Sequence, residues 1–229
     1  MQKEYVRRLF DSIANRYDLL NHLLSGGIDF YWRRAAIKTL IPHKPKRILD
    51  VATGTADFAI EAIRLNPEVV VGVDISEVML EIGRRKLAAK NLSEKIRLQT
   101  GEAEKLEFSD NSFDAAIVAF GARNFENLEA GLREMRRVIK AGGSVIVLEF
   151  SKPRKFPLRQ LYFLYFLHIL PLVGRIISGE KEAYRYLPET VMKFPDGEGF
   201  LDILRRIGFS AVRQQSLTFG IATIYCGEK

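Results

Sequence analysis

The chain has 229 residues, with 47% hydrophobic and 28% charged residues, which is typical of one globular α/β domain and excludes a disordered chain. Its single cysteine, Cys226, excludes a disulfide framework and a cysteine-rich zinc site, and favours a reducing, cytoplasmic compartment. The formal net charge of +7 favours a polyanionic partner, either nucleic acid or an anionic membrane surface. The first residues are charged and lack the apolar core of a signal peptide.

Residues 1–46 precede the first expected core strand and are predicted to be helical. Apolar and aromatic side chains recur at helical spacing until the two glycines at 26 and 27 break the pattern. Asp29 is expected to cap a second helix over residues 30–40, which Pro42 stops. A helical segment of this kind either covers the carboxyl edge of the following sheet or packs against its outer helices, and the pattern alone favours packing.

The next stretch predicts a ligand-binding turn. An apolar run that ends in Asp50 is typical of a buried parallel strand, and it is followed by a turn with Gly54 and Thr55 and by a helix. Such a unit brings backbone N–H groups against a nucleotide-like ligand. A second apolar run, residues 69–73, ends in Asp74, which lies 20 residues after Gly54, the spacing at which a carboxylate meets ribose hydroxyls.

The turn lacks the glycine fingerprint of dinucleotide sites, because Thr55, Ala56 and Asp57 follow Gly54. This absence argues against a ligand with a pyrophosphate. A nucleoside without phosphates, such as S-adenosylmethionine, needs only the turn, the helix start and the ribose carboxylate. An ordinary strand-helix-strand unit without any ligand fits these residues about equally well.

Two further strands are expected at residues 96–100 and 113–119, separated from the preceding strand by a helix that Ser76 caps. Glu102 and Ala103 follow the third strand and would lie beside an adenine ring bound across strands one to three.

Arg123 and Asn124 follow the fourth strand, at the sheet edge where doubly wound folds bind ligands. The pair could line a reaction pocket there. Equally, Asn124 could cap the next helix while Arg123 is solvated. That helix is expected over residues 127–140, ended by the glycines at 142 and 143, with a fifth strand at 144–150.

Residues 152–195 interrupt the alternation of strands and helices. The run 161–173 is the most apolar and aromatic in the chain, but it is too short to span a membrane and Pro171 would kink it. Lysine and arginine residues flank it on both sides. This pattern favours a helix on an anionic membrane surface, or an apolar lid over a pocket, above a buried core helix. His168 within the run is expected to be a hydrogen-bonded core group.

A short helix over residues 196–207 and two closing strands at 209–215 and 221–226 complete the chain, and the short connection makes those strands antiparallel. The expected fold is therefore α/β, a Rossmann-like, seven-stranded class I methyltransferase sheet with a terminal antiparallel hairpin. We expect one domain made of a helical cover (1–46), a cofactor-binding core (47–151), a hydrophobic helical insertion (152–195), and a closing helix and strands (196–229).

Three blocks in the chain resemble signatures of the menaquinone/ubiquinone C-methyltransferase family, and the match covers nearly the whole sequence. The first block runs from Tyr17 to Trp32, the second is Phe-Gly-Ala-Arg-Asn at 120–124, and the third runs from Arg137 to Ser151. The chain departs from the family pattern at four positions, with Leu20 for Met, Asp29 for His, Ala119 for Ser and Ala141 for Pro. No side-chain contact with the cofactor is therefore expected at position 119.

The resemblance implies transfer of a methyl group from S-adenosylmethionine to a ring carbon of a reduced polyprenyl quinone, most simply demethylmenaquinol. Arg123, Asn124 and Tyr17 are the catalytic candidates it implies, because a cation or hydrogen-bond donor beside the ring oxygen stabilises a developing phenolate. Residues that would hold the cofactor are Asp50, Gly54, Thr55, Asp74, Glu102 and Ala103. The segment 156–177 would shelter the prenyl tail and touch the inner face of the cytoplasmic membrane.

Other interpretations remain open. A precursor of ubiquinone, a 2-polyprenyl-6-methoxy-1,4-benzoquinol, is the alternative acceptor. The pI of about 9.5 suggests a nucleic-acid methyltransferase, but the cations flank an aromatic segment instead of an open groove, so no nucleic-acid partner is expected. A membrane-peripheral binding protein without activity is a third interpretation. The three histidines are scattered, so no metal site is expected, and the oligomeric state, a homodimer included, is left open.

Overall fold

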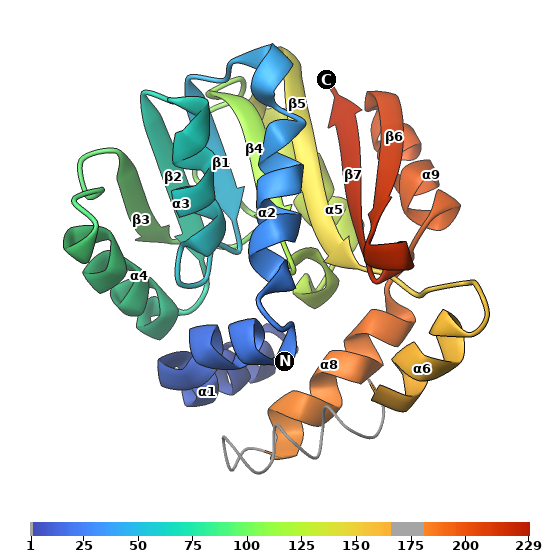
Figure 1. Cartoon of the computed structure of the whole chain (residues 1–229). Helices are drawn as coiled ribbons and strands as arrows, with labels where there is room; N and C mark the ends of the chain where they lie inside the picture. The colour runs from blue at the N-terminus through green and yellow to red at the C-terminus, as the bar shows by residue number, and fades with distance from the viewer. Residues whose placement is uncertain (1, 166–180) are drawn as a thin grey trace.

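The computed structural model of the chain describes residues 2–165 and 181–229. Seven strands form one sheet in the order β3-β2-β1-β4-β5-β7-β6 (Figure 1). β7 is antiparallel to both of its neighbours, and the other neighbouring strands are parallel. The strands are β1 (Arg47–Val51), β2 (Val69–Asp74), β3 (Ile96–Thr100), β4 (Phe113–Ala119), β5 (Ile139–Phe150), β6 (Ser210–Leu217) and β7 (Ala222–Glu228). The predicted fold class is confirmed, and the strand order reverses between β1 and β4.

Helices cover both faces of the sheet (Figure 1). One face carries α2 (Ile28–Lys38) and α3 (Asp57–Ala62), the other carries α5 (Leu128–Val138) and α9 (Glu198–Ile207), and α4 (Glu77–Ala89) packs beside β3. Beyond the edge at which the parallel strands end lie α1 (Gln2–Leu24), α6 (Leu158–Leu164) and α8 (Lys181–Lys193). Short 3-10 turns are η1 (Ile41–His43), η2 (Ile63–Leu65), η3 (Ala122–Asn124) and η5 (Thr218–Gly220).

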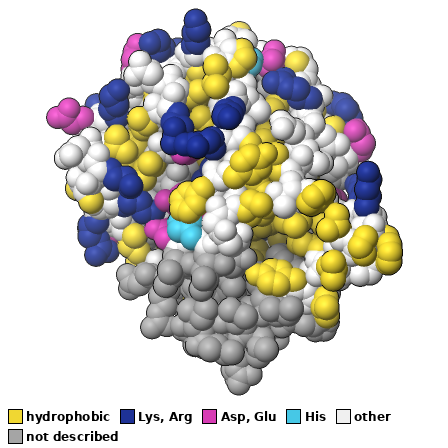
Figure 2. Space-filling model, viewed as in Figure 1, with side chains coloured by type: hydrophobic (Ala, Val, Ile, Leu, Met, Phe, Trp, Pro, Cys, Tyr) yellow, Lys and Arg dark blue, Asp and Glu magenta, His cyan; other side chains and the backbone are white. Residues whose placement is uncertain are grey.

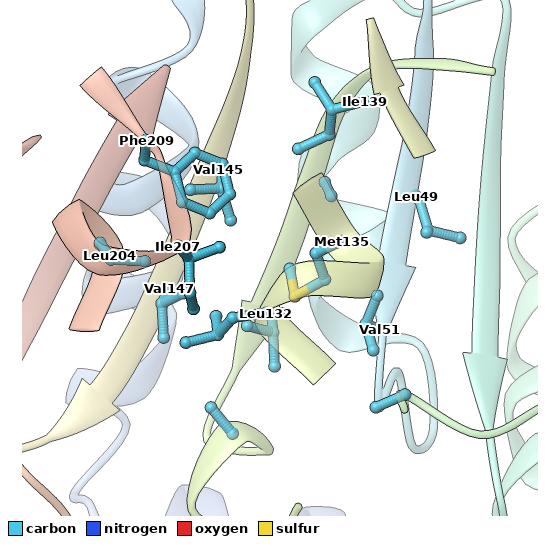
Figure 3. Close-up of a cluster of buried hydrophobic side chains, with 14 of the residues drawn as sticks. Leu49, Val51, Leu132, Met135, Ile139, Val145, Val147, Leu204, Ile207 and Phe209 are labelled. Carbon is cyan, nitrogen blue, oxygen red and sulfur yellow. The ribbon is translucent and has the colours of Figure 1, made fainter. Parts of the chain in front are cut away.

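The sheet divides the core into two layers. Ile48 faces the layer of α2 and α3, while its neighbour Leu49 faces the layer of α5 and α9, because successive strand residues point to opposite faces. Coverage of both faces explains why these strands read as continuous apolar runs. In the second layer Leu132 of α5 lies beside Ile207 of α9 (Figure 3). Each fully buried side chain of this size contributes about 1.5–3 kcal/mol.

The structure corrects the expected start of the fifth strand. β5 begins at Ile139, and α5 ends at Val138, so the glycines at 142 and 143 lie within the strand and do not end the helix. Ile139 pairs with Phe113, and the register then shifts before the regular pairing resumes. The backbone N–H of Gly142, which has a φ of +75°, donates to Lys229 at 2.9 Å. These glycines therefore form the irregular start of the strand. Adjacent glycines also occur where helices end, so the sequence alone does not distinguish the two cases.

The expected cap of α2 is also wrong. Gly27, with a φ of +77°, precedes the helix, and Asp29 lies inside its first turn. The buried Asp29 carboxylate accepts a 2.8 Å hydrogen bond from Ser25 and pairs with Arg33, while His22 Nδ1 lies 2.8 Å away. Burial alone would raise the pKa of Asp29, but Ser25 and Arg33 outweigh it and lower that pKa. Asp29 therefore joins the end of α1 to α2.

The insertion contributes two helices to the described part of the chain. Tyr162 of α6 is buried against Leu9 of α1 and Val191 of α8, whereas Leu161 and Leu164 are exposed. His168 and most of the apolar run lie outside the described residues. Within the described ranges, no helix has both the length and the hydropathy needed to cross a membrane.

Candidate functional site

A pocket opens where the strand order reverses, beyond the carboxyl ends of the parallel strands. Four connecting segments and α1 form its wall. The wall includes Ala52 and Gly54 after β1, Asp74 and Met79 around the start of α4, Ala103 after β3, Phe120, Asn124 and Phe125 after β4, and Lys3, Val6, Phe10 and Tyr17 of α1. The site thus assembles residues that are far apart in the sequence.

The turn after β1 is held from behind. Thr53 donates to the buried Asp50 carboxylate at 2.6 Å, and the Thr53 N–H donates to Val73 at 3.0 Å. Asp50 does not line the pocket, and its burial raises its pKa to about 7 despite the bond from Thr53. Gly54 has a φ of +55°, a conformation that glycine adopts at little cost. Asp50 therefore supports the turn and does not contribute to the pocket wall.

Asp74 presents a carboxylate to the pocket and is fixed by the backbone around it. One of its oxygens accepts from the N–H of Gly54 at 2.8 Å, and the other accepts from the N–H of Ser76 at 2.9 Å. Burial raises the pKa of Asp74, against the effect of these two donors. Each carboxylate oxygen keeps further acceptor capacity, so Asp74 can bind hydroxyl donors of a ligand.

Small residues allow the loops after β1 and β4 to meet. A Cβ atom on Gly121 would lie 2.6 Å from the Cβ of Ala52, so a side chain at this position would push the two loops apart. Phe125 depends on a second glycine in the same way, because a Cβ on Gly131 of α5 would lie 2.5 Å from its ring. The shape of the pocket therefore depends partly on glycine at positions 121 and 131.

Arg123 and Asn124 do not share one environment. Asn124 lines the pocket, and its Oδ1 atom is buried and has no hydrogen-bond partner among the described residues. Arg123 points elsewhere: its guanidinium pairs with Glu149 at 2.8 Å and lies 5.4 Å from the ring centre of Phe150. Asn127 caps α5, since it accepts from the N–H of Ala130 at 3.0 Å, so Asn124 is free of that task.

A second pocket borders η3 and α8. Arg123 and Phe125 line it together with Tyr186 and Thr190 of α8. Phe125 lines both pockets.

Besides Asp50, two more of the predicted cofactor-binding residues, Thr55 and Glu102, do not line the main pocket. Thr55 donates to Asp18 of α1 at 2.5 Å and receives a bond from Lys86 at 3.1 Å. The Glu102 carboxylate is about half exposed and pairs with Lys3 at 2.9 Å. Thr55 therefore binds two side chains that do not line the pocket, whereas Glu102 binds Lys3, which does.

Of the wall that α1 provides, only Tyr17 was predicted from the sequence as a site residue. Lys3, Val6, Phe10 and Tyr17 recur with helical spacing on one side of the helix, and all four line the pocket. Their spacing was visible in the sequence, but it also fits a helix that packs against the protein's outside. Met79 and Phe125 were missed as well, because single apolar residues near a strand end carry no distinctive signal.

Comparison with known proteins assigns the family. The whole chain, residues 1–229, matches the ubiE/COQ5 methyltransferase family. The chain belongs to this family. It is 48% identical to the demethylmenaquinone methyltransferase of Bacteroides fragilis, over 100% of this chain and 94% of the relative. It is 45% identical to the ubiquinone/menaquinone biosynthesis C-methyltransferase UbiE of Geotalea uraniireducens, over 99% and 97% of the two chains.

A crystal structure of an S-adenosylmethionine-dependent methyltransferase from Thermotoga maritima has the same fold. The TM-score is 0.69 at 21% identity, over 97% of this chain and 99% of the other. Family membership makes the protein a methyltransferase, with S-adenosylmethionine as its methyl donor.

The residues of the pocket fit that donor. Asp74 would accept hydrogen bonds from the ribose hydroxyls, and Gly54 and Ala103 leave room for a ligand close to the backbone. Asn124 offers a buried oxygen that no described residue satisfies. S-adenosylmethionine, when bound, supplies a methyl group that its sulfonium charge already activates.

Proposed function

We propose that this protein methylates a ring carbon of a reduced polyprenyl quinone, and that demethylmenaquinol, which becomes menaquinol, is its acceptor. The relative from Bacteroides fragilis, which is 48% identical over the full length of the chain, carries the name of this activity. The observation in the structure that supports the proposal most is the unsatisfied Asn124 Oδ1 atom within an aromatic pocket wall. A flat hydroquinone ring has the apolar faces and the hydroxyl donors that such a wall can bind.

Asn124 would act on the ring hydroxyl. Its Oδ1 atom would accept a hydrogen bond from the ring hydroxyl. This bond polarises the O–H bond and raises the electron density at the neighbouring ring carbon. That carbon is a weak nucleophile while the hydroxyl keeps its proton. Tyr17 lies in the same pocket wall, and we propose that its ring helps to orient the acceptor.

Arg123 would act through the position of Asn124. Its backbone N–H donates to Glu149 at 3.3 Å and its guanidinium donates to the same carboxylate at 2.8 Å. These bonds fix η3, which carries Asn124. A positive charge in this loop also favours negative charge on the ring oxygen, although Glu149 reduces its effect. We therefore propose Asn124 as the catalytic residue and Arg123 as a positioning residue.

Transfer of radiolabel from S-adenosylmethionine to reduced demethylmenaquinone tests the proposal. We expect labelled product with the hydroquinone and none with the oxidised quinone, because the quinone has no ring hydroxyl to polarise. An absence of label in every reduced prenyl quinone tested would contradict the proposal.

A ubiquinone precursor is the second candidate acceptor. The relative from Geotalea uraniireducens is named for both quinone pathways and is 45% identical to this chain. A benzoquinol that carries a methoxy group, tested in the same assay, separates the two candidates. Equal turnover of both acceptors would assign the protein to both reactions.

We also propose that the protein reaches its lipid-soluble acceptor from a membrane surface, at the inner face of the cytoplasmic membrane. Phe156, just before α6, and Phe219 of η5 are 81% and 77% exposed, and Leu161 and Leu164 are more than half exposed. Hydrophobic side chains gather over this part of the molecule in Figure 2. Exposed large apolar groups of this kind are typical of interaction surfaces.

Charge on this surface supports an anionic partner. Residues 151–165 contain the cations Lys152, Arg154, Lys155 and Arg159 and no acidic residue. Phe219 has a φ of +57°, which is costly for a bulky residue, and the turn nevertheless holds its ring outward. Apolar side chains next to cations fit the interface of a bilayer with anionic lipids. Residues 166–177 of the predicted membrane segment lie outside the described residues.

A further inference from the structure

Polar bonds fasten α1 to each of the three loops that follow β1, β2 and β3. Asp18 accepts a bond from Thr55 after β1 at 2.5 Å, and Asp11 accepts one from Ser76 after β2 at 2.5 Å. Lys3 pairs with Glu102 after β3 at 2.9 Å. Figure 1 shows α1 lying across the sheet edge where these strands end. The three bonded loops are also the loops that contribute Gly54, Asp74 and Ala103 to the pocket wall.

The contact after β1 is the most enclosed of the three. Lys86 of α4 lies 2.6 Å from Asp18 and 2.6 Å from Asp57, so one cation joins a carboxylate on α1 to one at the start of α3. The side chains of these residues are 19%, 27% and 20% exposed, in the order Lys86, Asp18, Asp57. Thr55, which bonds both Asp18 and Lys86, is buried. A partly buried cluster of this kind is screened less by salt than a surface pair.

Asp18 directly follows Tyr17, which lines the pocket, and Asp18 itself does not line it. The bonds of Asp18 therefore set the position of the pocket wall without placing Asp18 in the wall. On the opposite side, Leu9 of α1 packs with Tyr162 and Val191. Release of the Asp18 contact would leave the apolar contact of Leu9 and the contact of His22 with Asp29 in place, so the part of α1 around Tyr17 could shift while the helix stays attached on both sides of it.

We propose that Asp18 is a positioning residue, which holds α1 over the cofactor pocket through Lys86 and Thr55 and thereby slows the release of S-adenosylmethionine. The proposal concerns the donor alone and does not depend on which quinol is methylated. It gives the aspartate that follows Tyr17 in the first signature block a physical role of its own.

Dissociation of radiolabelled S-adenosylmethionine from the full chain, chased with unlabelled cofactor, tests the proposal. Asp18→Asn removes the charge with little change in shape, and we expect dissociation to be roughly tenfold faster. Arg8→Gln is the matched control, because Arg8 lies on α1, is highly exposed, and does not line the pocket. It should release the cofactor at the wild-type rate.

Amide hydrogen exchange in the absence of cofactor gives a second measurement. Residues of α1 should exchange faster in Asp18→Asn than in Arg8→Gln, while the strands of the sheet keep their protection. The triple variant Asp18→Lys, Lys86→Asp, Asp57→Asn exchanges the charges of the 18–86 pair without leaving two carboxylates side by side, and it should restore most of the slow dissociation.

Two results would overturn the proposal. One is a wild-type dissociation rate in Asp18→Asn, including the case in which fewer molecules fold but those that fold release the cofactor normally. The other is a folded triple variant that releases the cofactor as fast as Asp18→Asn does.

Discussion

Arg123 donates a 2.8 Å hydrogen bond to Glu149, and both side chains are almost fully buried, with exposures of 6% and 0%. Glu149 also accepts from the N–H groups of Arg123 and Phe150, at 3.3 and 2.9 Å. The carboxylate at the end of β5 therefore organises the loop after β4, which supplies Asn124 to the pocket.

Removal of Glu149 should strongly destabilise the fold. Glu149→Ala leaves the Arg123 guanidinium buried without its carboxylate, which costs about 3–5 kcal/mol. Urea unfolding measures this loss. The control is Asp202→Ala, which removes an exposed partner of Arg205 and should cost less than about 1 kcal/mol. Equal losses in the two variants would show that the buried pair contributes no more than a surface pair.

Asn124→Ala should separate catalysis from cofactor binding. The variant keeps the backbone of η3 but removes the oxygen that we assign to the ring hydroxyl. We expect kcat to fall by about 10²–10³, the range seen when one polar group that acts in the transition state is removed. Affinity for S-adenosylmethionine, measured by calorimetry, should change little. Full turnover in this variant would remove Asn124 from the mechanism.

Asp74→Asn should weaken binding of the methyl donor. The substitution removes the charge of an acceptor that two backbone N–H groups orient toward the pocket. Hydrogen bonds to charged groups contribute about 1.5–3 kcal/mol, which corresponds to roughly 10- to 100-fold in affinity. Calorimetric titration gives the affinity directly. Asp110→Asn, a change in an exposed carboxylate outside the pocket, should bind as the wild type does, and an equal loss there would contradict the assignment.

Asp50 should make stability depend on pH. Its pKa of about 7 in the fold lies above its ordinary value of 3.8, so the folded state binds the proton more tightly than the unfolded state. The contribution of this pKa shift to the free energy of unfolding is fully present below pH 3.8 and is lost as the pH rises to about 7. Asn does not titrate, so this loss should disappear in Asp50→Asn. As the pH rises from 4 to 8, the free energy of unfolding of the variant should therefore increase relative to that of the wild type by up to roughly 4 kcal/mol. Urea unfolding at several pH values tests the slope, and parallel pH profiles would contradict it.

Loss of the exposed phenyl rings should reduce membrane binding. The double variant Phe156→Ser, Phe219→Ser should bind anionic vesicles at least tenfold more weakly in co-sedimentation, since each ring that enters the interface contributes about 1.5–3 kcal/mol. Val78→Ser, which removes an exposed apolar group from α4, is the control. Unchanged vesicle binding in the double variant would contradict the proposed surface. So would wild-type binding that is as strong to neutral vesicles, or at high salt, as it is to anionic vesicles at low salt.

The sequence predicted the sheet well because its inner strands, such as β1, β2 and β4, are buried on both faces and therefore read as continuous apolar runs. The run before Asp74 is an example, and Ser76 also caps α4 as expected. The entry of β5 was mispredicted, because glycines that end a helix and glycines that form an irregular strand have the same composition. Local pattern cannot distinguish them, since the partner of Gly142 is Lys229 at the other end of the chain.

The pocket was predicted in part. The spacing between Gly54 and Asp74 was sufficient to identify two wall residues, because Gly54 follows β1 and Asp74 is the last residue of the neighbouring parallel strand β2. The partners of Thr55 and Glu102 could not be predicted, since Asp18 and Lys3 come from a helix whose position over the sheet depends on tertiary packing. Arg123 and Asn124 are adjacent in sequence, yet the short turn of η3 directs them into different surroundings.

Gly131 has a consequence for how variants of this enzyme would be interpreted. It lies on α5 and does not line either of the two pockets described, but any side chain there would meet the ring of Phe125, which borders both. A substitution at position 131 would displace that ring, and because Phe125 lines both pockets, the substitution should change the shape of the space in which ligands bind. A variant screen for activity should therefore identify this position among the sensitive ones, although it touches no substrate.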